Sequence, residues 1–360
     1  MPAVPENAAR LETLGRLADA RAFHDPLALE DAPADVLLRQ LRLMMLIRTA
    51  EEQLGDACVA KQMRCPVHLG IGQEAIAVGV SANLRNTDRV FGTHRSHAHF
   101  LALGAPVRSL FAEVLGREGG ASRGLGGSMH LAAPAYGFLG CVPIVAATIP
   151  IAVGAGLAAK MDGSDALSLA YFGDGACEEG VLHESLNLAA SMKLPVFFAA
   201  ENNLYSSHLL IDQRQPSNRL ARFAEAHGVE HEVVDGNDVV VVARVAARLA
   251  AQCRAGQPVF LEAVTYRWRG HVGPQEDQDV GVRRSTDLSE WKKRDPIQRL
   301  GAALCNAGHC TESEIVQMQQ AVRCEVGMAW DEAMASPPAS PKLTMDAVFA
   351  DPGGEVSRWP

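Results

Sequence analysis

The sequence predicts an α/β fold, a doubly wound parallel sheet, because strand-like and helix-like segments alternate along its centre. An apolar strand is expected at 167–172, an amphipathic helix at 179–191 and a second strand at 195–200. A further strand, helix and strand follow at 232–234, 238–253 and 258–266. Since strand–helix–strand units join parallel strands, these rounds indicate one parallel sheet covered by helices.

The segments before this sheet predict an arm and an entry helix. Residues 1–33 carry several prolines and little periodicity, so we expect an arm that lies on a partner or on the domain surface. From residue 34 to about residue 63, apolar side chains recur at helical spacing and predict a long amphipathic helix. The α/β domain is therefore assigned to residues 34–294.

The last part of the chain, residues 295–360, predicts a C-terminal helical segment and a tail. Thr311 and Glu314 form a capping-box pattern that opens a helix over 313–334. Prolines recur from Pro337 onward, which favours an irregular end.

Composition excludes several classes of function. The chain has 360 residues, 48% of them apolar, which suffices for a sizeable core. A net charge of -9 argues against nucleic acid and membrane partners, because phosphate binding needs a basic footprint. Apolar stretches such as 41–47 are too short to span a bilayer, and the acidic residues near the start are unlike a transit peptide, so we expect a cytoplasmic protein. Its eight cysteines show no CxxC spacing, which favours reduced thiols.

Two short polar motifs stand at the carboxyl ends of neighbouring predicted strands. The motif GDG (173–175) follows the first strand, and ENN (201–203) follows the second. In parallel sheets this edge holds the ligand crevice, and the intervening helix points its N-terminal amides into it. The arrangement predicts a site for a diphosphate group.

The same motifs offer the ligands that Mg²⁺ prefers. This ion takes oxygen ligands in near-octahedral geometry and retains phosphate oxygens and water. The carboxylate of Asp174, the side-chain amide of Asn203 and the backbone carbonyl of Tyr205 would supply them. Glycines on both sides of Asp174 let the backbone approach phosphates closely. In the absence of a ligand they would serve a plain strand-to-helix turn.

Four longer motifs flank this pair, and together they carry a family resemblance. They are HLGIGQEAIAVG from His68, THRSHAHFLALG from Thr93, RGLGGSMH from Arg123 and TYRWRGH from Thr265. With GDG and NN separated by 26 residues, the chain resembles the α subunits of thiamine-diphosphate-dependent 2-oxo acid dehydrogenases over roughly residues 35–350. The resemblance implies the thiamine-diphosphate-binding fold, the cofactors thiamine diphosphate and Mg²⁺, and oxidative decarboxylation of a 2-oxo acid with acyl transfer to a lipoyl group.

The resemblance also implies roles for individual residues. His271, beside the diphosphate, and His68, near the substrate, are the implied catalytic residues, although a structural role is an equal alternative for His68. Arginine suits a diphosphate contact because its planar guanidinium makes bidentate bonds. The residues implied to bind the cofactor are His94, Arg95, Val145, Asp174, Gly175, Ala176, Asn203, Arg267 and His271, and those implied to bind the metal are Asp174, Asn203 and Tyr205.

Two segments depart from the family pattern. The residues PIVA (143–146) stand where pyruvate-type relatives have Gly-Ile-Val-Gly, so the apolar support Val145 is retained while its flanking glycines are not. Val272 stands where regulated relatives carry a phosphorylated serine, so kinase control is not expected. With Gly270 as a hinge, the segment 268–284 is expected to order when the diphosphate binds. The substrate stays open between the pyruvate, branched-chain and acetoin types.

Other enzymes remain alternatives. An acetoin dehydrogenase or a lipoyl-independent carboligase would use the same cofactor clamp. Gly154, Gly156 and Ala159 spell GxGxxA, the fingerprint of NAD-dependent dehydrogenases with a Rossmann fold, but prolines interrupt the strand that this fingerprint requires. Thr148 and Pro150 instead look like a helix N-cap and first turn, which would make both glycines packing residues.

The stretch HRSHAH raises one metal-binding alternative. His94, His97 and His99 could form a metal cluster or simply begin a helix. Magnesium avoids imidazole ligands, so the helix start is preferred.

The resemblance implies a partner as well. In the family, a separate β subunit supplies a glutamate that activates the aminopyrimidine ring, and the active site forms between the subunits of an α2β2 heterotetramer. No residue of this chain can be assigned that role. A lipoyl-bearing acyltransferase is a further implied partner.

Overall fold

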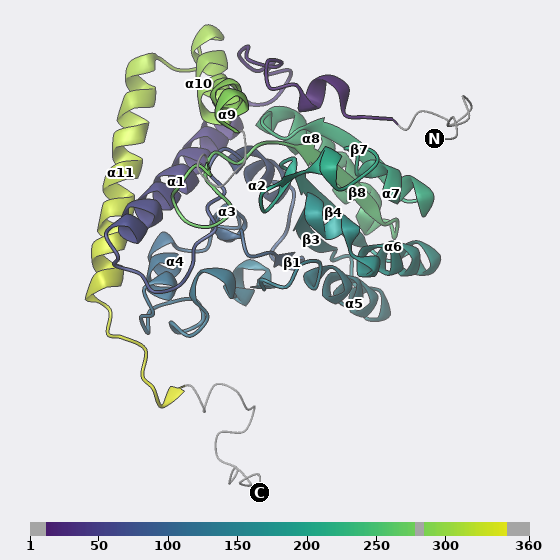
Figure 1. The fold of residues 1–360 in the computed structure, drawn as a ribbon, viewed down its shortest axis with the longest axis horizontal. Helices are drawn as coiled ribbons and strands as arrows, with labels where there is room; N and C mark the ends of the chain where they lie inside the picture. The colour runs from purple at the N-terminus through teal and green to yellow at the C-terminus, as the bar shows by residue number, and fades with distance from the viewer. Residues whose placement is uncertain (1–11, 278–283, 344–360) are drawn as a thin grey trace, which may run out of the picture.

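A six-stranded parallel sheet forms the centre of the computed structural model, which describes residues 12–277 and 284–343 (Figure 1). The strand order is β2-β1-β3-β4-β8-β7, and each neighbouring pair is parallel. The strands are β1 (Arg89–Gly92), β2 (Phe138–Cys141), β3 (Ser168–Gly173), β4 (Val196–Asn202), β7 (Glu230–Asp235) and β8 (Val259–Val264). The predicted parallel α/β class is confirmed, and each of the four strands predicted from the sequence is present.

Helices cover both faces of the sheet, as Figure 1 shows. Along β3, Leu169 and Tyr171 join one core, while Ala170 and Phe172 join the other. The alternation explains why these strands are continuous apolar runs, because both faces are buried. The helices of the first core are α1 (Ala34–Val59), α2 (Glu74–Ser81), α3 (His97–Ala102), α4 (Val107–Val114) and α8 (Val239–Arg254), and those of the second are α5 (Thr148–Met161), α6 (Gly180–Met192) and α7 (Ala221–Ala226).

The C-terminal helices complete the first core. Helix α10 (Pro296–Asn306) and helix α11 (Glu312–Ala335) pack against α1, and Figure 1 shows α11 beside α1 along one side of the molecule. The side chains of Leu300 and Val322 are fully buried there. The predicted capping box of Thr311 and Glu314 is confirmed, with the Glu314 amide donating to Thr311 Oγ1 at 3.2 Å.

The N-terminal arm lies on the domain surface, one of the two places expected for it. The amide of Leu14 donates to Asn218 Oδ1 at 2.9 Å, and Arg294 donates to the carbonyls of Leu17 and Asp19. Residues 1–11 of the arm lie outside the described part of the chain. A short helix, α9 (Ser285–Trp291), and a two-stranded hairpin of β5 (Tyr205–Ser206) and β6 (Leu209–Leu210) complete the elements. Among the described residues, no helix has the length and apolar character needed to cross a membrane.

Helix α5 corrects two details of the sequence analysis. Ala147, rather than Thr148, is the N-cap, and Thr148 is the first helical residue. Gly156 is a packing residue as expected, since an added Cβ would lie 2.6 Å from Val196 Cγ2, but Gly154 is exposed and has nothing within 4 Å. Both glycines lie inside the helix and not in a strand-to-helix turn. The alternative that GxGxxA binds NAD in a Rossmann fold is therefore wrong.

The register of the sheet sets the position of the site. Strands β3 and β4 are neighbours, and Gly173 pairs with Glu201 at their carboxyl ends. The motifs that follow these strands therefore lie side by side, as the βαβ prediction required.

Candidate active site

A cavity of about 180 Å³ lies at the carboxyl ends of β3 and β4. All residues proposed from the sequence for catalysis, cofactor binding and metal binding line it, although they come from segments more than 200 positions apart. They are His68, His94, Arg95, Val145, Asp174, Gly175, Ala176, Asn203, Tyr205, Arg267 and His271. The structure therefore brings the whole predicted set together at one site.

The three candidate metal ligands present oxygen atoms from two adjacent loops. Asp174 is 1% exposed and Asn203 is 7% exposed. Asn203 Oδ1 accepts from the Tyr205 amide at 3.2 Å, and its Nδ2 donates to Gln73 Oε1 at 3.1 Å, which fixes the amide orientation with oxygen toward the Tyr205 backbone. Burial raises the pKa of Asp174, and the guanidinium of Arg214 acts against that rise. One carboxylate, one oriented amide oxygen and one carbonyl form an oxygen donor set that suits Mg²⁺.

Two buried arginines give the cavity its positive charge. Arg95 donates to the carbonyl of Leu69 at 2.6 Å and to that of His271 at 3.2 Å, while Arg267 donates to the carbonyl of Tyr205 at 3.3 Å. Burial lowers the pKa of Arg95 to about 10 and that of Arg267 to about 9, so both stay cationic at pH 7. The carbonyl partners of Arg95 do not neutralise its charge, whereas Arg267 also lies 3.5 Å from the carboxylate of Asp277. The Nε of Arg267 is buried and has no hydrogen-bond partner among the described residues, which fits an absent anionic group such as a diphosphate.

The backbone that faces the cavity after β3 is a short 3-10 helix, Asp174–Glu178, and not the first turn of α6. Gly175 and Ala176 of this turn line the cavity, whereas α6 begins only at Gly180. We expected the N-terminal amides of α6 to face the cavity, and this was wrong, because the 3-10 turn that precedes α6 faces it instead. An added Cβ on Gly175 would lie 2.4 Å from Ser206 Oγ, so glycine is needed for the close approach of the two loops.

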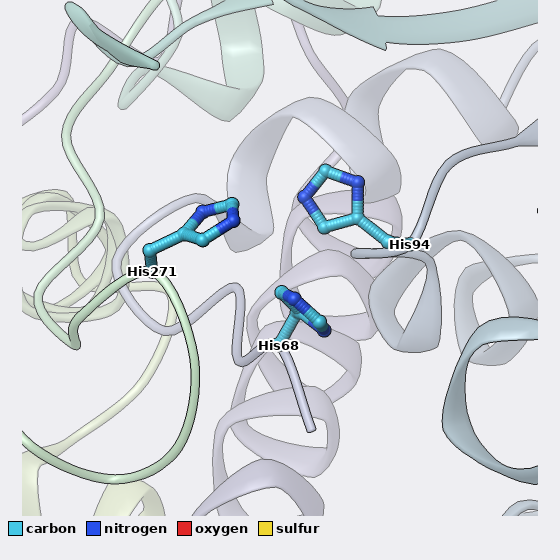
Figure 2. Close-up of side chains that lie close together, drawn as sticks. All are labelled: His68, His94 and His271. Atoms are coloured by element: carbon cyan, nitrogen blue, oxygen red, sulfur yellow. The ribbon is translucent and has the colours of Figure 1, made fainter. Parts of the chain in front are cut away.

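Three histidines face one another on one wall of the cavity (Figure 2). The ring centroids of His68 and His94 are 4.6 Å apart. The ring centroid of His271 lies 5.2 Å from that of His68 and 5.5 Å from that of His94. Burial, reinforced by the charge of Arg95, lowers the pKa of His68 to about 3, of His94 to about 2 and of His271 to about 4. The three rings are therefore neutral at pH 7.

The alternative cluster of His94, His97 and His99 does not form. His97 lies within 2.8 Å of Ser128 Oγ and 3.2 Å of Glu51 Oε1. His99 stacks on Tyr171 with a centroid distance of 3.7 Å. Both rings belong to buried polar contacts of α3, which is the helix start that the sequence favoured.

The backbone of the His271 loop is held by Asp277. The amide of His271 donates to Asp277 Oδ2 at 2.8 Å, and an added Cβ on Gly270 would lie 2.2 Å from Asp277 Oδ1. Gly270 is thus required for the close approach of this carboxylate. The predicted ordering of 268–284 on cofactor binding stays a prediction, and residues 278–283 lie outside the described part of the chain.

The segment 143–146 lies at the rim of the cavity. Val145 is 51% exposed and Ile144 is 69% exposed, so their apolar side chains are available to a ligand or a partner. Ala146 has a φ of 63°, in the left-handed region that favours glycine. Alanine is therefore strained at this position, where glycine would be free of strain.

Three residues of the site were missed by the sequence analysis. Gln73 orients Asn203, Glu201 lines the cavity and lies 3.2 Å from His99 Nε2, and Arg214 contacts Asp174. Gln73 and Glu201 stand within motifs that were already noted. Arg214 had no local signal, because it reaches Asp174 from a loop 40 positions along the chain.

Comparison with known proteins agrees with this geometry. Residues 42–342 match the dehydrogenase E1 component family. The chain is 37% identical to the pyruvate dehydrogenase E1 component subunit alpha of Rhizobium meliloti (strain 1021), covering 83% of this chain and 86% of that protein. It is 36% identical to the Zymomonas mobilis subunit of the same name, with coverage of 87% and 88%. Identity with the human somatic mitochondrial form is 34%, with coverage of 89% and 83%.

The fold, the cavity and these matches together define the class of this protein, and the chain belongs to the dehydrogenase E1 component family. Within that family it is an α subunit of a thiamine-diphosphate-dependent 2-oxo acid dehydrogenase, a decarboxylating oxidoreductase.

Proposed function

We propose that this α subunit binds the diphosphate of its cofactor through a Mg²⁺ ion held by Asp174, Asn203 and the carbonyl of Tyr205. The observation that carries the proposal is that these three residues line one cavity together with the two buried guanidinium groups of Arg95 and Arg267. Arg95 and Arg267 would contact the diphosphate oxygens, and the amides of Gly175 and Ala176 would face them. Val145 would support the aminopyrimidine ring at the rim.

When bound, thiamine diphosphate supplies a carbon nucleophile and an electron sink for decarboxylation. The protein's part is to orient substrate and protons around it. The neutral rings of His68 and His271 can donate a hydrogen bond to a developing negative charge or accept one from an acid. The two arginines, which stay charged, favour an anionic 2-oxo acid in the same cavity.

The proposed partner is a β subunit, with which the chain would form an α2β2 heterotetramer. The relatives are named as alpha subunits of a pyruvate dehydrogenase component, which makes pyruvate the first substrate to test. A lipoyl-bearing acyltransferase is the proposed acyl acceptor. Acetoin cleavage and lipoyl-independent carboligation stay as alternatives, because the cofactor clamp would be the same for them.

The proposal is tested by calorimetric titration of the co-expressed complex with thiamine diphosphate and Mg²⁺. We expect Asp174→Ala or Asn203→Ala to weaken magnesium-dependent binding by at least roughly 10 to 100-fold, because losing a mere partner of a metal ligand already costs that much. A surface variant such as Asp165→Ala is the control, because Asp165 pairs with Arg85 in solvent. Unchanged affinity in both site variants would refute the assignment. Supplying the wild-type complex with pyruvate, branched-chain 2-oxo acids or acetoin, and following acyl transfer to lipoamide, identifies the substrate.

A further inference from the structure

The three cavity histidines form a potential metal site that is separate from the proposed magnesium ligands. His68 follows α1, His94 follows β1 and His271 follows β8, so each ring is held by a different segment. One ring nitrogen from each histidine lies within 4.8 Å of the other two, and Figure 2 shows the three rings converging. No other group of three or more histidine, cysteine or acidic side chains comes together in this way within residues 12–277 and 284–343.

The nitrogen atoms of this cluster are available for coordination. The Nδ1 of His68 is buried and has no hydrogen-bond partner among the described residues. A buried imidazole nitrogen without a partner is uncommon and calls for a ligand or a water. All three rings are in the neutral form that coordinates metals, as described above.

The geometry favours one class of ion. Mg²⁺ requires oxygen ligands, whereas neutral imidazoles suit Zn²⁺ and similar divalent transition metals. Tetrahedral Zn²⁺ with bonds of about 2.0–2.1 Å needs ligand nitrogens roughly 3.4 Å apart. The ring nitrogens are now up to 4.8 Å apart, and side-chain torsion changes that move each ring by about 1 Å would bring them to this spacing. Three protein ligands would leave the fourth position open to the cavity.

Positive charge near the three histidines opposes the binding of a metal ion. Arg95 and Arg267 face the same cavity and repel a cation. Their guanidinium groups already donate to backbone carbonyls, so they are directed partly away from the rings. The repulsion predicts that an anion or hydroxide takes the open position, since it would neutralise part of the added charge.

We propose that His68, His94 and His271 bind one divalent transition-metal ion, with Zn²⁺ as the natural occupant, and that this occupancy excludes the cofactor from the cavity. All three rings line the cavity that would hold the diphosphate, so a metal drawn between them takes the space and the side chains that the cofactor would use. The two ligands must then weaken each other's binding by the same factor.

Cobalt(II) titration of the full chain co-expressed with its β subunit tests the metal site without cofactor. Tetrahedral Co²⁺ absorbs visible light strongly, so the spectrum reports three-histidine coordination directly. We expect one ion per α chain, a visible spectrum and displacement by Zn²⁺. His94→Tyr keeps an aromatic ring of similar shape and should weaken binding by at least roughly 10-fold, and His271→Gln, on a different segment, should do the same.

His208→Gln is the matched control, because its ring lies 6.4 Å from that of His271 and is not part of the cluster. It should bind Co²⁺ as the wild type does. Equal Co²⁺ affinity in His94→Tyr and His271→Gln, with both variants folded by circular dichroism, would overturn the site. Saturating thiamine diphosphate and Mg²⁺ should weaken Co²⁺ binding at least roughly 10-fold, and unchanged Co²⁺ affinity would overturn the exclusion. The cofactor-free titration stands whether or not the proposed magnesium site is correct.

Discussion

The guanidinium of Arg214 contacts the carboxylate of Asp174, the leading candidate ligand for Mg²⁺, and also contacts Glu178. Both side chains of the Arg214–Asp174 pair are almost fully buried, at 7% and 2% exposure. The buried carboxylate is thereby kept beside a positive charge even without a metal. Arg214 acts as a positioning residue that links the segment after the β5–β6 hairpin to the end of β3.

Replacing Arg214 should make the stability of the protein depend more strongly on Mg²⁺ and cofactor. We expect Arg214→Gln to lower the free energy of unfolding by about 3 kcal/mol, because breaking a buried pair leaves its partner charge uncompensated. Mg²⁺ with thiamine diphosphate should then raise the melting temperature more in the variant than in the wild type, since the ion replaces the lost charge. Arg85→Gln breaks an exposed pair and should cost less than about 1 kcal/mol. Equal stabilisation by the ligands in Arg214→Gln and the wild type would contradict the relationship.

Replacing His271 should affect turnover more than folding. His271 is half-buried at the cavity, and the structure around it is held through its backbone, which His271→Ala retains. We expect the variant to melt close to the wild type and to bind cofactor, but to lose about 10²-fold in acyl transfer, the usual contribution of a positioned acid or base. Val272→Ala, at an exposed neighbour, is the control. Normal turnover in His271→Ala would remove this residue from the chemistry.

Glycine at position 146 should relieve strain at the cavity rim. Ala146 has a φ of 63°, whereas Ala147 has a φ of -61° in the right-handed region. Ala146→Gly should remove roughly 1–2 kcal/mol of left-handed strain from the folded state. It also gives the unfolded chain more entropy, which lowers stability by about 0.4–1 kcal/mol. We therefore expect the free energy of unfolding to rise by about 0.5 kcal/mol. Ala251→Gly, at an exposed position inside α8, should instead lose about 1 kcal/mol, because only the entropy cost applies there. Chemical denaturation of both variants checks the opposite signs, and a loss in both would argue against strain at Ala146.

Much of this site could be predicted from sequence because its residues stand in contiguous motifs. Asp174 and Asn203 each follow an apolar strand, and adjacency of parallel strands is sufficient to bring them together. His68, His94 and His271 were assigned only through the family resemblance, since nothing local indicates that their rings meet. Four of the six strands and the long first helix followed from periodicity, whereas the short strands β1 and β2 at one edge of the sheet were not predicted.

The parts that could not be predicted depend on long-range contacts and local backbone geometry. Arg214 reaches Asp174 through a loop path that no spacing encodes. A 3-10 turn over Asp174–Glu178 precedes α6, and Gly175 in this turn lies close to Ser206, which comes from a separate hairpin. The strain at Ala146 becomes visible only when φ is known.

The depressed pKa of His68 should make the protein sensitive to acid. Its folded-state pKa of about 3 lies below the value of 6.5 for an exposed histidine, so between these pH values the unfolded chain binds the extra proton. The free energy of unfolding is therefore unaffected by this group above pH 6.5 and falls as pH drops from 6.5 toward 3. His68→Asn should flatten the dependence of melting temperature on pH in that window. His309→Asn, on an exposed loop, should not, and an equal slope in wild type and His68→Asn would contradict the burial effect.

Helices α5 and α6 expose large apolar side chains that a partner subunit could cover. Ile151 and Met161 on α5 are 51% and 78% exposed, and Leu188 and Met192 on the adjacent α6 are 44% and 39% exposed. Val145 at the cavity rim is exposed as well, and exposed apolar side chains on neighbouring elements are of the kind found at protein interfaces. A permanent interface of this class would bury about 2,000 Å² or more.

We therefore expect the isolated chain to self-associate and to lack turnover, and co-expression with a β subunit to restore cofactor binding and decarboxylation. Ile151→Asp should weaken the assembly, because a charge at a packed apolar contact is costly to bury. Val316→Asp, at a residue 67% exposed on α11, is the control and should assemble normally. Size-exclusion chromatography with light scattering measures the assembly, and decarboxylation is followed in the same fractions. Turnover of a 2-oxo acid at ordinary enzymatic rates by the purified lone chain would show that the active site is complete without a partner.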